Sequence, residues 1–340
     1  MSFEDIKGQD RAIRILRASL RNNRIFSSYL FVGPDGIGKF ETAKNFAKAI
    51  NCSSEKNPPD ACETCSSCKR INSRTHPDIF FVAPKGVSST IGVDEIRGVI
   101  SKANLKPYEA KKKVFIIDNA HSMNNASSNA FLKTLEEAPK DTIFILISRS
   151  KELLLSTIVS RCHAIKFFTA PPQELLNVLT EKFNLKKNEA KILNNFSSSR
   201  IGEAIRMKDK DLIKRKNRVI DSLLSIDGHA SDFSEEIANY NTRNEFKENL
   251  EFILSFFRDV FLYKTISDEN ALFHADKIAE IKSECEKFTL EDLDYLMKKV
   301  ITLSSYIDYN VNPKIIVDVL TNELRSYYAR GSTGKAARSR

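Results

Sequence analysis

The segment GPDGIGKF, residues 33–40, contains most of a phosphate-binding loop. Such a loop has Gly, four residues, Gly-Lys and then Ser or Thr, and Gly33, Gly38 and Lys39 meet this pattern. The next residue is Phe40, which has no oxygen to hold the magnesium ion of a bound nucleotide. The sequence therefore predicts the loop of a nucleotide-binding fold without its metal ligand.

A second change affects the residue that would activate water. In working sites of this kind, an Asp at a strand end holds the metal and a neighbouring carboxylate polarises the attacking water. The segment VFIIDNAH supplies Asp118 but has Asn119 next to it, and an amide is a poor proton acceptor at neutral pH. Both changes predict that hydrolysis is lost. The sequence leaves open whether Asp118 and the loop still bind a nucleotide. The alternative is that the glycine-rich segment is only a tight turn before a helix.

Four of the six cysteines fall within residues 52–68, as Cys52, Cys62, Cys65 and Cys68. Two CxxC spacings share Cys65, and thiolates at such spacings can converge tetrahedrally on zinc. Disulfides are the alternative, but a reducing cytosol would keep these thiols free. Four sulfur ligands leave no open position for water. We therefore expect a structural Zn²⁺ ion that holds a polar loop together.

Length and composition set the broad class of protein. The chain has 340 residues, 41% of them hydrophobic and 29% charged, which favours a globular protein of two or three domains. It has no run of eighteen apolar residues, and its first residues lack the apolar stretch of a signal peptide. We therefore expect a cytoplasmic location and no membrane partner. The formal charge of +9 suits contact with nucleic acid or an acidic partner.

Short apolar segments alternate with helical patterns up to about residue 168. The apolar segments are 29–32, 79–82, 114–118, 143–148 and 164–168. Their near-continuous apolarity is typical of strands buried on both faces of a parallel sheet. Helical patterns lie at 9–22, 39–51, 93–104 and 123–137. This alternation predicts an α/β domain over residues 1–169, in which helices flank a parallel sheet.

The pattern changes at the APP segment, residues 170–172. Proline disfavours a helical conformation for the residue before it, so we place a domain boundary here. Residues 170–207 have the pattern of short helices, and residues 208–330 have only helical periodicity. The last ten residues, 331–340, are small, polar and basic, and we expect them to form a disordered tail.

Together these motifs resemble one protein family. The P-loop, the four-cysteine segment and the segments HPDIFFV, VFIIDNAH, NAFLKTLEEAP and STIVSRC follow the order found in the bacterial clamp loader of DNA polymerase III. That assembly is an AAA+ machine that opens the ring-shaped sliding clamp and places it on primed DNA. The resemblance covers residues 3 to about 207 by specific motifs and the remainder by order only. It implies a P-loop AAA+ domain, a small helical lid domain and an all-α collar domain.

The resemblance also implies a role for Arg161. In this family the arginine of a Ser-Arg-Cys motif reaches the ATP of a neighbouring subunit, and Arg161 lies between Ser160 and Cys162. Motor subunits have a hydroxyl residue after the loop lysine and Asp-Glu on the acidic strand, from which Phe40 and Asn119 depart. These losses resemble a subunit that does not hydrolyse ATP but supplies an arginine finger in trans. Its partners would be motor subunits and a delta-type subunit in a hetero-oligomeric ring, with the sliding clamp and primed DNA reached through the complex.

Two other functions remain open. The chain could be an ATP-hydrolysing motor subunit with an unusual loop, against which Phe40 and Asn119 argue. It could also be a zinc-dependent nucleic-acid-binding module built on a degenerate ATPase scaffold. The motor subunits carry an arginine in their second domain, and its position aligns here with Gly202.

The first predicted helix carries a repeated basic residue. Its arginines recur at helical spacing, as Arg11, Arg14, Arg17 and Arg21. A solvated helix face is the simpler interpretation of this pattern. Contact with a DNA backbone is the alternative, since charge alone gives sequence-independent binding.

Overall fold

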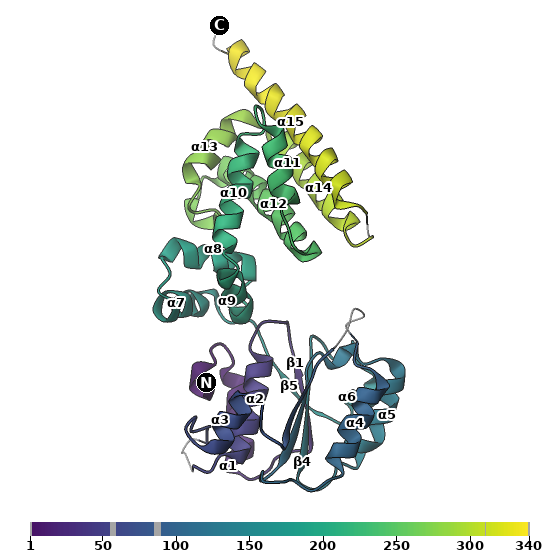
Figure 1. The fold of residues 1–340 in the computed structure, drawn as a ribbon. Coiled ribbons are helices and arrows are strands. Elements are labelled where there is room, and N and C mark those ends of the chain that lie inside the picture. Colours follow the sequence, from purple (N-terminus) through teal and green to yellow (C-terminus); the bar gives the residue numbers. More distant parts are fainter. Residues whose placement is uncertain (1, 55–58, 85–89, 310, 339–340) are drawn as a thin grey trace. The chain divides into compact units, whose positions relative to one another are not determined.

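The computed structural model describes residues 2–54, 59–84, 90–309 and 311–338. The chain forms two compact units (Figure 1). The first comprises Met1–Leu175 with Ser198–Glu203, and the second comprises Leu176–Ser197 with Ala204–Arg340. Each unit has a core of its own and is described by itself below.

The first unit contains a parallel five-stranded sheet in the order β2-β3-β4-β1-β5. Its strands are β1 (Ser28–Val32), β2 (Ile79–Val82), β3 (Lys113–Ile117), β4 (Thr142–Ser148) and β5 (His163–Lys166). The predicted parallel sheet is therefore confirmed, with each strand within about two residues of its expected bounds. The strand that precedes the P-loop, β1, pairs with β4 and not with the Asp118 strand, β3.

Helices cover both faces of this sheet (Figure 1). One face carries α1 (Asp10–Arg21), α2 (Lys39–Asn51) and α3 (Ser66–Asn72); the other carries α4 (Val93–Ala103), α5 (Asn125–Glu136) and α6 (Ser156–Val159). Successive strand residues point to opposite faces, so Phe31 packs in the core under α2 whereas Leu30 packs in the core on the α5 side. Both faces are buried, which explains why these strands read as continuous apolar runs. Short 3₁₀ helices lie at η1 (Phe3–Asp5) and η2 (Ala120–Ser122).

Beyond β5, the described residues form helices and connections. The helices are α7 (Pro172–Phe183), α8 (Lys187–Ser197), α9 (Ile201–Asp209), α10 (Leu212–Leu224), α11 (Ala230–Ala238), α12 (Arg243–Ile266), η3 (Glu269–Ala271), α13 (Ile278–Lys287), α14 (Leu290–Tyr306) and α15 (Pro313–Arg338). The all-α character predicted for this region is confirmed. Its division into a lid over 170–207 and a collar over 208–330 stays a prediction.

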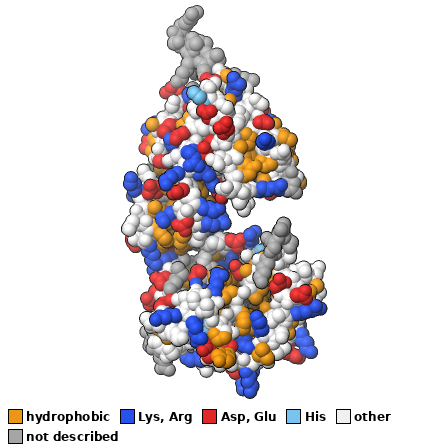
Figure 2. All heavy atoms as spheres, viewed as in Figure 1, with side chains coloured by type: hydrophobic (Ala, Val, Ile, Leu, Met, Phe, Trp, Pro, Cys, Tyr) orange, Lys and Arg blue, Asp and Glu red, His pale blue; other side chains and the backbone are white. Residues whose placement is uncertain are grey.

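The core of the second unit forms around α12. Phe246, Leu250, Ile253 and Phe257 lie fully buried on this helix at helical spacing. Figure 2 shows a hydrophobic patch on the surface where α14 and α15 lie. Exposed apolar side chains on these helices include Ile301, Tyr306, Ile315 and Val319.

The C-terminal end differs from its prediction. Helix α15 continues to Arg338, so the backbone of residues 331–338 is helical where the sequence predicted a disordered tail; residues 339–340 lie outside the described residues. The buried Ile316, Leu320 and Leu324 anchor the earlier turns of α15. Adding residues to an established helix costs much less than nucleating one, so the helix extends into a polar segment. Among the described residues, no helix is long and apolar enough to cross a membrane.

Candidate functional site: a P-loop, a cysteine cluster and a surface arginine

The P-loop connects β1 to α2 and is closed by a segment from much later in the chain. Gly36 and Gly38 have φ of +73° and +93°, in the left-handed region that favours glycine. The Gly202 N–H donates to the Gly36 carbonyl oxygen at 2.7 Å. A Cβ on Gly202 would lie 3.0 Å from that oxygen, which is closer than most Cβ contacts, so the close approach favours glycine. Gly202, which we expect to align with the motor subunits' arginine, therefore packs directly on the loop.

Lys39 is held by its own loop. Its side chain is 5% exposed, and Nζ donates to the carbonyl oxygens of Gly33 and, at 2.6 Å, Pro34. Asp35 lies 3.6 Å from the same Nζ and also pairs with Arg149 at 2.5 Å. Burial lowers the pKa of Lys39, and the charge of Asp35 opposes this shift. The cation that would balance phosphate charge is thus bonded within the chain.

Phe40, in the position of the metal ligand, is partly buried and packs against the hydrophobic core. Its ring centroid lies 5.8 Å from that of Phe81. The guanidinium of Arg74 lies over both rings, 5.3 Å from Phe40 and 5.4 Å from Phe81. The next hydroxyl, on Thr42, is buried and donates to the Gly38 carbonyl at 2.8 Å. Neither side chain presents an oxygen to a phosphate.

Asp118 and Asn119 lie just after the end of β3. Asp118 accepts a hydrogen bond from the Asn119 N–H at 3.0 Å, and burial raises the pKa of its carboxyl although the Lys39 charge lowers it. Asn119 itself adopts a left-handed φ of +49° in the turn into η2. The charge of Lys39 therefore acts on Asp118, and so does that of the Asp35 carboxylate, which raises the pKa of Asp118 further. The residue directly after Asp118 is Asn119 and not a carboxylate.

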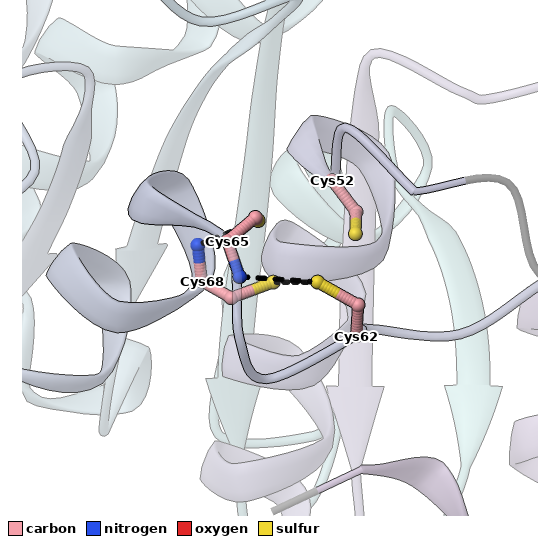
Figure 3. A group of neighbouring side chains, drawn as sticks. All are labelled: Cys52, Cys62, Cys65 and Cys68. Atoms are coloured by element: carbon pink, nitrogen blue, oxygen red, sulfur yellow. Dashed lines mark hydrogen bonds between the residues drawn. The ribbon is translucent and has the colours of Figure 1, made fainter.

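The four predicted zinc ligands converge. The sulfur atoms of Cys52, Cys62, Cys65 and Cys68 all lie within 4.8 Å of one another, and the sulfurs of Cys62 and Cys68 are 4.0 Å apart (Figure 3). Four sulfurs at about 2.3 Å from a central Zn²⁺ would be separated by about 3.8 Å. The donor set and its spacing therefore fit a tetrahedral zinc ion.

Backbone and hydroxyl donors surround these sulfurs. The N–H groups of Cys65 and Cys68 lie 3.3 and 3.4 Å from the sulfurs of Cys62 and Cys65, respectively. The hydroxyl of Thr64 donates to Cys62, and this bond lowers the pKa of the Cys62 thiol to about 5. Burial instead raises the pKa of Cys52 and Cys68. The hydrogen bond from Thr64 thus favours the thiolate form of Cys62, which is the form that binds a metal ion.

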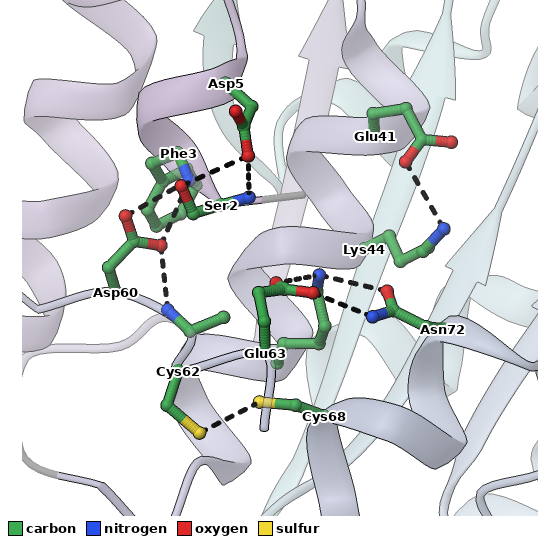
Figure 4. Close-up of polar contacts among 12 residues, drawn as sticks. Ser2, Phe3, Asp5, Glu41, Lys44, Asp60, Cys62, Glu63, Cys68 and Asn72 are labelled. Atoms are coloured by element: carbon green, nitrogen blue, oxygen red, sulfur yellow. Dashed lines mark hydrogen bonds and ion pairs between the residues drawn. The ribbon is translucent and has the colours of Figure 1, made fainter. Parts of the chain in front are cut away.

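Buried ion pairs attach the cysteine segment to the rest of the unit (Figure 4). Asp60 accepts from the Phe3 N–H at 3.0 Å and pairs with Arg17 at 3.0 Å. Lys48, fully buried on α2, donates to Glu63 at 2.5 Å and to Asn72 at 3.0 Å. These contacts fix both ends of the loop that carries Cys62.

Arg161 follows α6 at the surface of the first unit. Its Nη2 and Nε donate to Glu136 Oε2 at 2.8 and 3.1 Å, and Nη1 donates to the Thr157 carbonyl at 3.0 Å. The Arg161 side chain is 31% exposed and that of Glu136 is 61% exposed. The neighbouring Cys162 packs against the core, and burial raises its pKa to about 12. The backbone is anchored, whereas the guanidinium is held only by surface contacts.

Sequence reasoning missed four partners in these sites. Glu136 belongs to the quoted LEEAP segment, but nothing in the spacing relates it to Arg161, 25 residues later. Arg149 and Gly202 close the loop from other elements, and Arg74 covers Phe40 from a left-handed residue, φ +59°. Each is a long-range contact, and no local pattern in one sequence reports it.

Two family models match the chain. "DNA polymerase III, delta subunit" matches residues 8–171, and "DNA polymerase III, delta subunit, C terminal" matches residues 210–324. DNA polymerase III subunit delta' of Bacillus subtilis is 29% identical over 319 residues, covering 92% of this chain and 94% of the relative. Subunit tau of the same organism is 28% identical over 343 residues, covering 93% of this chain and 60% of tau. A solved gamma subunit-related protein of Thermotoga maritima has a TM-score of 0.43 and 18% identity, and covers 93% of this chain and 99% of its own.

Proposed function

We propose, from the premise that this chain belongs to the DNA polymerase III clamp-loader family as a delta-prime-type subunit, that it acts as a stator. A stator does not hydrolyse ATP itself. It joins motor subunits and a delta-type subunit in a hetero-oligomeric ring, and it completes a neighbouring subunit's ATP site with Arg161. In this way it contributes to loading the sliding clamp on primed DNA.

The side chain of Phe40 carries the first half of this proposal. It occupies the position of the magnesium ligand and packs between Arg74 and Phe81, so restoring a metal ligand there would remove a core contact. Asn119 in place of a carboxylate removes the group that would polarise water. Two parts of a hydrolytic site are therefore missing, and Lys39 is bonded to loop carbonyls.

The surroundings of Arg161 support the second half. An ion pair between partly exposed side chains contributes only about 0–1 kcal/mol, so exchanging Glu136 for a phosphate costs little. A guanidinium stays charged at all relevant pH values and presents a planar fork of donors that matches phosphate oxygens. Placed at a neighbour's γ-phosphate, it would stabilise the charge that develops during phosphoryl transfer.

The cysteine cluster has a structural part in this proposal. Cys52, Cys62, Cys65 and Cys68 would hold Zn²⁺, which would cross-link the end of α2 to the start of α3. Four thiolates leave no ligand position for a substrate. The protein's own contacts through Asp60 and Lys48 orient the segment around that cross-link.

Reconstitution with motor subunits tests the arginine finger. With Arg161→Ala, ATP turnover at the site that Arg161 completes should fall by about 10³-fold or more. The total ATPase rate of the assembly should therefore fall by the amount that this site contributes. Arg161→Lys should restore little, since an ammonium lacks the fork. Arg97→Ala is the matched control, because Arg97 is an exposed arginine of the same unit in a surface pair with Asp94. An unchanged rate in complexes that contain the Arg161→Ala subunit would contradict the proposal.

An active motor subunit is the second candidate, favoured by the similarity to tau over 93% of the chain. The two candidates differ in the isolated chain. A stator should show no magnesium-dependent ATP turnover above buffer. Turnover by the isolated chain that is lost with Lys39→Ala would replace the stator with the motor subunit.

A further inference from the structure

The outer face of α1 carries arginines that lack carboxylate partners. Arg11, Arg14, Arg21 and the following Arg24 are all exposed. Among the described residues, no ion pair forms with any of these four, whereas Arg17 on the same helix pairs with Asp60 and Glu4. The opposite face of α1 packs Ala12, Ile13 and Leu16 into the core. The arginine face therefore has a fixed position and an unbalanced positive charge.

A groove runs along this face. Its volume is about 470 Å³, and it is lined by Asp10, Ile13, Arg14, Arg17, Ala18 and Arg21. Asp10 is its one acidic lining residue and lies at the N-terminal end of the helix. Ten residues of helix separate Arg11 from Arg21, or about 15 Å, which is the length of several nucleotides along a strand.

An exposed aromatic ring follows these arginines. Phe26 is 49% exposed and lies two residues after Arg24. Its ring is stacked on the imidazole of His163, with centroids 4.2 Å apart and an angle of 7° between the planes. Tyr29 supports it edge-on at 5.9 Å, so the ring is held in place while about half of it faces solvent. A fixed, exposed ring offers a flat surface on which a nucleobase can stack.

We propose that the arginine face of α1, together with Phe26, binds single-stranded DNA, with the guanidinium groups on phosphates and a base on the Phe26 ring. Guanidinium forks bind the oxygens of phosphates and carboxylates in pairs, so the arginines alone indicate an anionic partner. The exposed Phe26 ring favours a nucleic acid over an acidic protein, because a base can stack on it. An unpaired base has an exposed π-face, whereas bases within a duplex are stacked on each other. This site needs no nucleotide in the P-loop and no contact by Arg161, so it stands apart from the stator function.

Fluorescence anisotropy on the full, zinc-loaded chain tests the proposal, with labelled 20-nucleotide oligo-dT and a 20-base-pair duplex as probes. Oligo-dT should bind with a strong salt dependence. Arg14→Ala combined with Arg21→Ala should weaken binding at least 10-fold and reduce the slope of log K against log salt by about 1.4, or about 0.7 for each lost phosphate contact. Thermal unfolding should not change, because both side chains are exposed and unpaired.

A control of equal charge comes from the second unit. Arg325→Ala combined with Lys314→Ala removes two exposed positive charges from α15. This variant should bind oligo-dT as the wild type does. Arg161→Ala should also bind normally, so failure of the stator function and failure of this site give different results.

Phe26 separates stacking from charge. Phe26→Ala should weaken oligo-dT binding by roughly 5- to 150-fold and leave duplex binding unchanged. The chain has no tryptophan, so Phe26→Trp introduces a single reporter whose fluorescence a stacked base should quench.

Four outcomes would overturn the proposal. The first is that oligo-dT does not bind, and the second is that the Arg325 and Lys314 control weakens binding as much as the Arg14 and Arg21 variant does. The third is that the duplex binds as tightly as oligo-dT and Phe26→Ala has no effect. The fourth is that poly-glutamate competes as strongly as oligo-dT at equal charge.

Discussion

The two ends of α2 differ in how the polar groups beside them find partners. At its N-terminal end, the charged side chains of the P-loop have partners within the chain. Lys39 donates hydrogen bonds to loop carbonyl oxygens, and Asp35 pairs with Lys39 and Arg149. The Gly202 N–H donates to the Gly36 carbonyl oxygen. At its C-terminal end the sulfurs of four cysteines lie within 4.8 Å of one another. In the first loop the charged side chains pair within the chain, whereas the second segment brings together four sulfurs that could hold a metal ion. The contrast corresponds to two parts of the proposal: a loop that does not hydrolyse a nucleotide and a segment that would bind a structural ion.

The largest expected effect follows from removing the proposed Zn²⁺ ion. Cys62→Ser combined with Cys65→Ser, or chelation of the wild type, should destabilise the first unit by several kcal/mol, because metal binding contributes directly to folding free energy. Thermal unfolding followed by circular dichroism, with zinc content by mass spectrometry, measures both. Cys285→Ser is the control, since Cys285 lies in the second unit and should leave one zinc per chain. Unchanged unfolding after complete zinc loss would remove the distinction between the two ends of α2.

The next effect concerns the pair that holds the cysteine segment to α2. Lys48→Met removes a fully buried cation and leaves Glu63 and Asn72 without that donor. We expect a loss of about 2–3 kcal/mol, below the 3–5 kcal/mol of a fully buried pair because Glu63 is 28% exposed. Chemical denaturation measures it, and Lys44→Met, at a partly exposed pair with Glu41, should cost much less. A larger loss for Lys44→Met would contradict this assignment.

A smaller effect tests the closure at the other end of α2. Gly202→Ala places a Cβ 3.0 Å from the Gly36 carbonyl oxygen and should weaken the loop contact by about 1–2 kcal/mol. Hydrogen exchange at the Gly202 amide reports the opening directly. The control is Gly98→Ala, where a Cβ would meet nothing within 4 Å. Equal exchange in Gly202→Ala and the wild type would mean that the loop is not closed by this contact.

The smallest effect concerns the cover over Phe40. Arg74→Ala removes a guanidinium from above the Phe40 and Phe81 rings and should cost about 0.5–1 kcal/mol. Urea denaturation is sensitive enough to measure it. Retention of the loss in Arg74→Lys, which keeps the charge without a planar group, would indicate a stacking contribution. A higher free energy of unfolding for Arg74→Ala than for the wild type would mean that the guanidinium does not stabilise the Phe40 ring.

Local patterns predicted the elements of this protein well. Helix α2 begins at Lys39 and ends at Asn51 as expected, because the glycine-rich turn fixes its start and polar residues follow its end. The convergence of the cysteines also followed from their spacing, since short turns limit how far sulfurs can separate. What the sequence did not reveal is how charges are satisfied across the fold. The pairing of Arg161 with Glu136 and that of Arg149 with Asp35 depend on contacts between distant segments.

The lengths of the strands have a consequence for the subunit outside its assembly. The sheet is longest at its centre, with seven residues in β4, and shortest at both edges, with four residues each in β2 and β5. A short edge exposes few unpaired N–H and C=O groups, and the exposed Lys166 on β5 adds a charge where another strand would have to approach. The α/β unit is therefore poorly suited to extending its sheet with a strand from a second molecule, and this protects it against edge-to-edge aggregation while it is free.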